Sequence, residues 1–186
     1  MADNRFRDRW FVGDGIDIGC GDDPLDTSVW VNARSVRPYD RDRGDRDGQF
    51  LEEVADGSFN FVHSSHCLEH LENPRAALHN WLRVLKPGGF IVCTIPEELY
   101  YEFAKWPSRW NPDHKNSFTM RSMPLIPTSQ NVLQLLWRLP ADVEHVTLLS
   151  EHWDPKKAGE DQTLGNAECA IEFVVRKQLP EKVMPW

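Results

Sequence analysis

The chain has 186 residues, of which 40% are hydrophobic and 11% aromatic, including eight Trp. This length and apolar content suit one domain with a full core and exclude a disordered protein. With 29 acidic and 21 basic residues the net charge is −8, which argues against a nucleic acid as the main partner.

Cysteine usage and hydropathy indicate the compartment. The four cysteines form no C-x-x-C pair, and three of them lie in apolar runs, which favours free thiols in a reducing cytoplasm. No stretch approaches the length of a membrane span. We therefore expect a cytoplasmic protein without a membrane span, and a small molecule as its partner.

Hydrophobic spacing and turn residues predict strands alternating with helices along the chain. Strands are expected at 10–18, 29–36, 58–63, 90–95, 143–150 and 168–176, and helical segments at 67–71, 74–85 and 131–139. Residues 50–54 fit either a helical turn or a short strand, and 100–127 is an irregular aromatic stretch. The two late strands, joined by a polar loop, predict a mostly parallel α/β sheet that ends in an antiparallel hairpin.

The helix predicted at 74–85 has well-defined ends. Asn73 is a favourable N-cap and Pro74 suits the first turn, while Gly88 and Gly89 follow the last apolar position. Apolar residues at spacings of three and four build one buried face on this helix.

The stretch Asp17-Ile18-Gly19-Cys20-Gly21 places two glycines directly after a predicted strand. Without a Cβ, the backbone there lets a flat ligand approach closely, although a tight structural turn would need the same residues. Pro24 stands where a dinucleotide site has its third glycine, which disfavours a nicotinamide cofactor.

These motifs, taken together, resemble class I S-adenosylmethionine-dependent methyltransferases of the type 11 kind, in particular a bacterial subgroup. After the glycine loop, residues 58–62 and 64–71 resemble the family's fourth strand and the helix that follows it, and 82–89 resembles the approach to its fifth strand. The resemblance implies one domain over residues 1–186. It also implies a Rossmann-like, seven-stranded, mostly parallel sheet with a C-terminal antiparallel hairpin and helices on both faces.

The resemblance also implies S-adenosylmethionine as cofactor. The family's second-strand acid, counted from Asp17, falls at Arg37, so Asp40 is the nearest residue able to bind the ribose. Asp47 resembles the adenine-binding carboxylate, and a side chain at Gly19 is expected to occupy the cofactor's place. The implied cofactor-binding residues are Asp17, Gly19, Cys20, Gly21, Asp40, Asp47, Gly48, Gln49, Ser64, Ser65 and His66.

Methyl transfer depends mainly on holding donor and acceptor in line, and it needs a base only when the acceptor must lose a proton. His114, in a loop expected to overhang the donor, is one candidate base, although a surface turn would also explain it. His66, beneath the expected sulfonium, is the other.

The resembling subgroup suggests a sugar or polysaccharide precursor as the small-molecule acceptor. A homodimer partner or the 100–127 stretch is expected to close the acceptor side. The Arg37 position leaves a second hypothesis open, a non-catalytic S-adenosylmethionine- or nucleotide-binding module of the same fold.

The sequence His66-Cys67-Leu68-Glu69-His70 spells H-x-x-E-H, which resembles the zinc-binding helix of inverted zinc peptidases. Two imidazoles four residues apart on a helix could bind zinc with the carboxylate as base, making a zinc hydrolase a remote alternative. No downstream helix offers an evident third ligand, so no metal ligands are assigned from the sequence.

Overall fold

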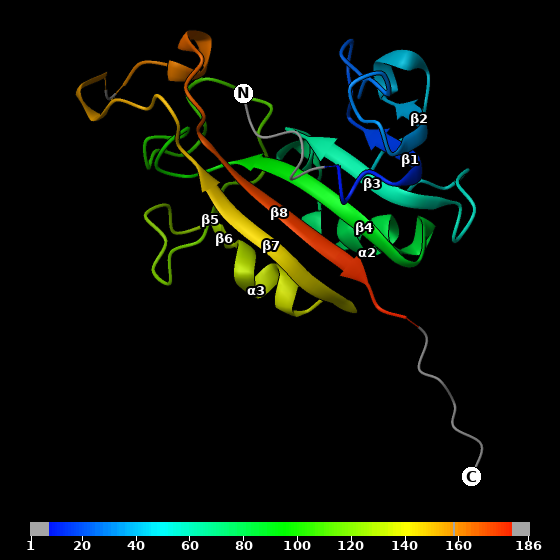
Figure 1. Ribbon diagram of the computed structural model, residues 1–186. Coiled ribbons are helices and arrows are strands. Elements are labelled where there is room, and N and C mark those ends of the chain that lie inside the picture. The colour runs from blue at the N-terminus through cyan, green and yellow to red at the C-terminus, as the bar shows by residue number, and fades with distance from the viewer. Residues whose placement is uncertain (1–7, 158, 180–186) are drawn as a thin grey trace.

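The structure, a computed structural model, describes residues 8–157 and 159–179, so the single-domain prediction for residues 1–186 extends beyond them and stays a prediction. Six strands form one sheet in the order β2-β1-β3-β4-β8-β7 (Figure 1). Their bounds are β1 Gly13–Ile18, β2 Ala33–Tyr39, β3 Phe59–Ser65, β4 Leu85–Pro96, β7 Ala141–Leu149 and β8 Ala170–Lys177.

Strand directions match the predicted topology. β1 pairs in parallel with β2 and β3, and β3 pairs in parallel with β4. β8 runs antiparallel to both β4 and β7. The mostly parallel sheet with a C-terminal antiparallel hairpin is therefore confirmed.

Two α-helices and several short elements complete the described chain. These are α2 Pro74–Val84, α3 Val132–Trp137, the two-residue strands β5 Phe118–Thr119 and β6 Gln130–Asn131, and the 3-10 turns η1 Arg41–Arg43, η2 Leu68–His70, η3 Pro155–Lys157 and η4 Gln162–Gly165. Asn73 caps α2 as predicted, because its side-chain oxygen accepts from the Ala76 N–H at 3.0 Å. None of the described helices has the length and apolar character needed to cross a membrane.

The prediction of helices on both faces is wrong for the described residues. Side chains of α2 and α3 share one core with one face of the sheet, where Trp81 is fully buried. The opposite face is covered by Phe11 and Trp30, which pack on Phe61, Val92 and Val174. After β1, residues 21–32 form turns instead of a helix. The Asp17 carboxylate holds this segment, because it accepts the Leu25 N–H at 2.7 Å.

The sheet has six strands rather than the predicted seven because residues 50–54 fold into turns. The Arg83 guanidinium on α2 donates to the carbonyls of Leu51 at 2.9 Å and Val54 at 2.8 Å. A third bond reaches the Phe50 carbonyl at 3.3 Å. These carbonyls are the acceptors that a strand would use for pairing, so Arg83 takes the place of a neighbouring strand.

The second strand begins four residues later than predicted, at Ala33 rather than at 29. Val29 and Val31 are exposed, whereas Trp30 packs edge-on against Phe11 with ring centroids 5.0 Å apart. Pairing of Gly13 with Ala33 and of Ile18 with Tyr39 then fixes the register. As a result, Asp40 comes directly after the strand, at the same sheet edge as the glycine loop.

Candidate functional site

Two cavities of about 610 Å³ each lie at the carboxyl ends of β1, β2, β3 and β4. The first, here called the Asp40 cavity, is lined by Asp40, Arg41, Gly48, His70 and Lys115 among others. The second, the Thr94 cavity, is lined by Asp17, His63, Ser65, Thr94 and Cys169 among others. Both have Gly19 and His66 in their walls, so the two cavities adjoin at these residues.

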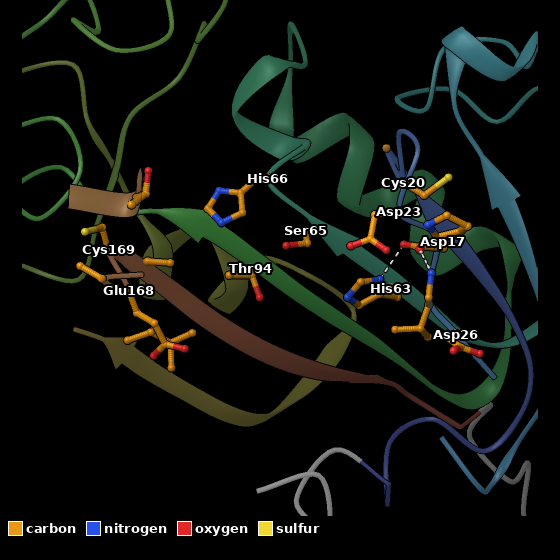
Figure 2. Close-up of a pocket in the computed structure, with 17 residues that line it drawn as sticks. Asp17, Cys20, Asp23, Asp26, His63, Ser65, His66, Thr94, Glu168 and Cys169 are labelled. Carbon is orange, nitrogen blue, oxygen red and sulfur yellow. Dashed lines mark hydrogen bonds and ion pairs between the residues drawn. The ribbon is translucent and has the colours of Figure 1, made fainter. Parts of the chain in front are cut away.

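Figure 2 shows how the side chains of the Thr94 cavity lie. Asp17 and Asp23 are at one end, Glu168 and Cys169 are at the other, and Ser65 and Thr94 come between them. The lining is polar in the middle and acidic at both ends. Such a surface suits a ligand that carries hydroxyl or amino groups.

The glycine loop packs closely on the segment after β3. Gly19 has φ +74°, and its N–H donates to the Tyr39 carbonyl at 2.8 Å. A Cβ at this position would lie 2.4 Å from both Cβ and Sγ of Cys67. A side chain at Gly19 would therefore meet Cys67 rather than only a ligand, which corrects the expectation that it would simply occupy the cofactor's place.

Asp40 ties the end of β2 to the glycine loop. Its Oδ2 accepts from the Gly21 N–H and its Oδ1 from the Asp42 N–H, each at 2.9 Å. Arg37, by contrast, pairs with Asp45 at 3.2 Å and does not line the Asp40 cavity. The acid of the second strand is thus held in a fixed orientation at the cavity wall, with lone pairs left on both oxygens.

The turn around Asp47 contributes backbone to the same cavity. Asp47 accepts from the Gln49 N–H at 2.8 Å, and Gly48 lines the wall. The Gln49 side chain is buried, and its Oε1 accepts from the Asn73 N–H at 2.7 Å. Gln49 therefore supports the start of α2 and lines neither cavity, unlike its predicted role.

Several predicted residues around β1 and β3 are occupied by internal contacts. Asp17 lies 2.6 Å from Nδ1 of His63 and is almost fully buried. The fully buried Ser64 donates to the Ile18 carbonyl at 2.9 Å and lines neither cavity, whereas Ser65 and Cys20 do line the Thr94 cavity. Ser64 thus joins two strands, and Ser65 is the one of the pair that reaches a cavity.

The two predicted bases have different surroundings. His66 has φ +52°, its side chain is 50% exposed, and its N–H donates to the Thr94 carbonyl at 2.9 Å. His114 is only 3% exposed, and its Nδ1 lies 2.8 Å from Oε1 of Glu102. It lines neither cavity, so the geometry supports His66 over His114 as the imidazole next to a ligand.

The cysteines of the site are suited to packing rather than to nucleophilic chemistry. Burial raises the pKa of the Cys169 thiol to about 11, and it also raises the pKa of Cys20. Both groups are therefore protonated near neutral pH and weakly nucleophilic. Cys169, His63 and Thr94 were not found from the sequence, although Thr94 lies near the carboxyl end of a predicted strand, a position typical of site residues in α/β sheets.

Comparison with known proteins bears on the whole fold. A family model described as a methyltransferase domain matches residues 5–152. A search of curated protein sequences finds no match.

Solved structures resemble the chain over most of its length at low identity. A SAM-dependent methyltransferase from Archaeoglobus fulgidus is 17% identical with a TM-score of 0.61, covering 93% of this chain and 90% of its own. An S-adenosylmethionine-dependent methyltransferase from Mesorhizobium loti is 16% identical with a TM-score of 0.55, covering 90% and 93%. The [4+2]-cyclase SpnF is 16% identical with a TM-score of 0.62, covering 95% and 81%. At these identities the likeness is one of fold.

Proposed function

The chain belongs to the methyltransferase domain family, and on this basis we propose that it transfers a methyl group from S-adenosylmethionine to a small hydroxylated acceptor. The observation that carries the proposal is Asp40, fixed at the end of β2 beside the glycine loop and facing a cavity of about 610 Å³. This volume lies within the range of small-molecule sites.

The residues present fit the cofactor. Asp40 has a remaining lone pair on each oxygen for the two ribose hydroxyls, while Gly48 offers backbone to the adenine side. Gly19, in the wall of both cavities, lets the methionine end pass close to the main chain. When bound, the cofactor would supply a methyl group on a positively charged sulfur. The thioether that remains after transfer is neutral and is a good leaving group.

The Thr94 cavity is the proposed acceptor site. Ser65 and Thr94 offer hydroxyl groups to position the acceptor, and His66, shared by both cavities, is placed to take a proton from an acceptor hydroxyl. The volume of the Thr94 cavity, about 610 Å³, supports an acceptor as large as a sugar.

The first experiment is isothermal titration of the purified protein with S-adenosylmethionine, followed by transfer of a labelled methyl group to a panel of sugars and other hydroxylated compounds. We expect binding and transfer to at least one hydroxylated acceptor. Absence of cofactor binding would refute the proposal. Binding without transfer to any acceptor would instead favour a non-catalytic module of the same fold.

A further inference from the structure

We infer that Glu69, His70 and His114 form a binding site for one divalent transition-metal ion, with His66 at its open side. One ligand atom of each of the first three residues lies within 4.8 Å of the others. The inference concerns metal binding alone; the site shares His66 with the proposed methyl transfer and borders the Asp40 cavity, so cofactor binding is measured separately.

Glu69 is the centre of this cluster. Its side chain is fully buried, and neither carboxylate oxygen accepts a hydrogen bond from the described residues. A buried, unsatisfied carboxylate is costly unless a cation compensates for it. The cluster therefore contains a buried ligand group that accepts no side-chain or backbone hydrogen bond from the described residues.

Three imidazole nitrogens surround Oε1 of Glu69. The distances are 3.5 Å to Nδ1 of His66 and 3.9 Å to Nε2 of both His70 and His114. These separations are too long for hydrogen bonds. They are close to the spacing of about 3.4 Å between two ligands that share a tetrahedral ion with bonds of about 2.0–2.1 Å.

Carboxylates hold the opposite nitrogens of the two inner rings. Nδ1 of His70 lies 3.1 Å from Oδ2 of Asp113, and Nδ1 of His114 lies 2.8 Å from Oε1 of Glu102. A hydrogen on each Nδ1 leaves a lone pair on each Nε2, directed toward Glu69. Metal-binding histidines typically have this carboxylate–histidine arrangement, which fixes the tautomer and orients the ring.

The charges of the cluster also favour a cation. Glu69 and Glu102 are both buried, and within residues 8–157 and 159–179 they form ion pairs only with histidines. Lys115, the neighbouring cation, pairs with Glu72 at 2.7 Å. A divalent ion would offset this negative charge where no lysine or arginine of the described chain does.

The backbone positions the two segments before any ion binds. The N–H groups of Lys115 and Asn116 donate to the Glu69 carbonyl at 2.9 and 3.0 Å, and the Asn116 side chain donates to the Leu71 carbonyl at 2.6 Å. His114 is therefore held against Glu69 by the main chain on its C-terminal side. Such preorganisation of ligands favours metal affinity.

The donor set indicates the class of metal. Two imidazoles and a carboxylate suit Zn²⁺, Co²⁺ or Ni²⁺, whereas Mg²⁺ and Ca²⁺ prefer oxygen ligands. His66 and His70 also line the Asp40 cavity, so the ion would be reached from that side. The zinc-peptidase geometry is absent, because η2 is a single 3-10 turn and Glu69 faces the imidazoles as a ligand.

The test uses chelator-stripped protein titrated with Co²⁺ alone, monitored by visible absorption and by displacement with Zn²⁺. We expect one Co²⁺ per chain, and a loss of affinity of at least about 100-fold in His70→Ala and His114→Ala. Glu102→Gln, which alters only the support of His114, should weaken binding by about 10- to 100-fold. His79→Ala, which removes an exposed histidine of α2, is the matched control and should bind normally.

His114 is buried, so its variant could fail to fold, whereas the His70 side chain is 23% exposed and its variant is the safer probe. Thermal unfolding provides a second measurement, because Zn²⁺ should raise Tm in the wild type and in His79→Ala but not in His70→Ala. Absence of Co²⁺ binding in the wild type, or unchanged binding in His70→Ala, would overturn the inference. Neither result bears on cofactor binding, which is measured separately.

Discussion

Replacing Asp40 by Asn tests the placement of the cofactor most directly. Both carboxylate oxygens already accept a backbone N–H, from Gly21 and Asp42, each at 2.9 Å. The amide nitrogen of Asn cannot accept, so one of these N–H groups loses its partner and one ribose hydroxyl loses a charged acceptor.

The expected loss of affinity follows from this count. A hydrogen bond to a charged group contributes about 1.5–3 kcal/mol, so S-adenosylmethionine should bind Asp40→Asn about 10- to 100-fold more weakly. Asp40 is partly exposed, so the cost in folding stability should be nearer 1 kcal/mol, or about 2–4 °C in Tm. Isothermal titration and thermal unfolding measure the two effects separately.

Asp42→Asn is the matched control, because Asp42 lies in the same cavity wall and its side chain makes no hydrogen bond to the residues that the structure describes. It should bind the cofactor within about threefold of the wild type, since exposed charges contribute little. A cofactor product analogue without ribose hydroxyls sharpens the test: it should bind the wild type and Asp40→Asn with similar affinity. Two results would refute a ribose-binding role for Asp40. One is an equal loss of cofactor affinity in Asp40→Asn and Asp42→Asn, and the other is a loss of affinity for the analogue in Asp40→Asn as large as that for the cofactor.

Two further predictions concern the fold and the thiols. Arg83→Met should lower the free energy of unfolding by about 3 kcal/mol, and Tm by about 6–12 °C, because the carbonyls of Phe50, Leu51 and Val54 each lose a hydrogen bond from the guanidinium. The Leu51 carbonyl still accepts from the Val54 N–H at 3.0 Å. The exposed Arg75→Met on the same helix should change little. Unchanged Tm in Arg83→Met would mean that packing alone shapes those turns. With its pKa raised to about 11, Cys169 should be ionised to only about one part in a thousand at pH 8, against about one in ten at an ordinary pKa near 9. Site-resolved mass spectrometry after iodoacetamide should therefore show slow labelling of Cys169 that speeds up as pH rises toward 11, and fast labelling at pH 8 would contradict this.

The sequence alone was enough to predict the elements whose capping residues and apolar spacing lie within the element itself or directly beside it. Helix α2 begins at Pro74 because the Asn73 cap and the apolar spacing act within a few residues. The apolar run of β4 and the strand β8 were predicted for the same reason. Such elements depend on periodicity and capping, which a single sequence displays.

Features that depend on distant residues could not be predicted in this way. Whether residues 50–54 pair as a strand is decided by Arg83, and the start of β2 is decided by its register on β1. Counting residues from Asp17 led to Arg37 rather than to Asp40, because the length of the turns after Gly21 could not be read from the sequence. The third metal-ligand candidate, His114, lies in an irregular loop, and only folding brings it to Glu69.

The missing seventh strand has a consequence for self-association. β2 is an outer strand of the sheet, and no described element pairs with its far side. An uncovered strand edge can template aggregation with other chains unless charges or proline interrupt it. β2 carries Arg34, Arg37 and Pro38, so two bulky cations and a residue without an N–H donor lie along that edge. The hydrogen bonds from Arg83 to residues 50–54 and the composition of β2 therefore act together. The first hold residues 50–54 in turns where a seventh strand was expected, and the second disfavours pairing of the open β2 edge with another chain.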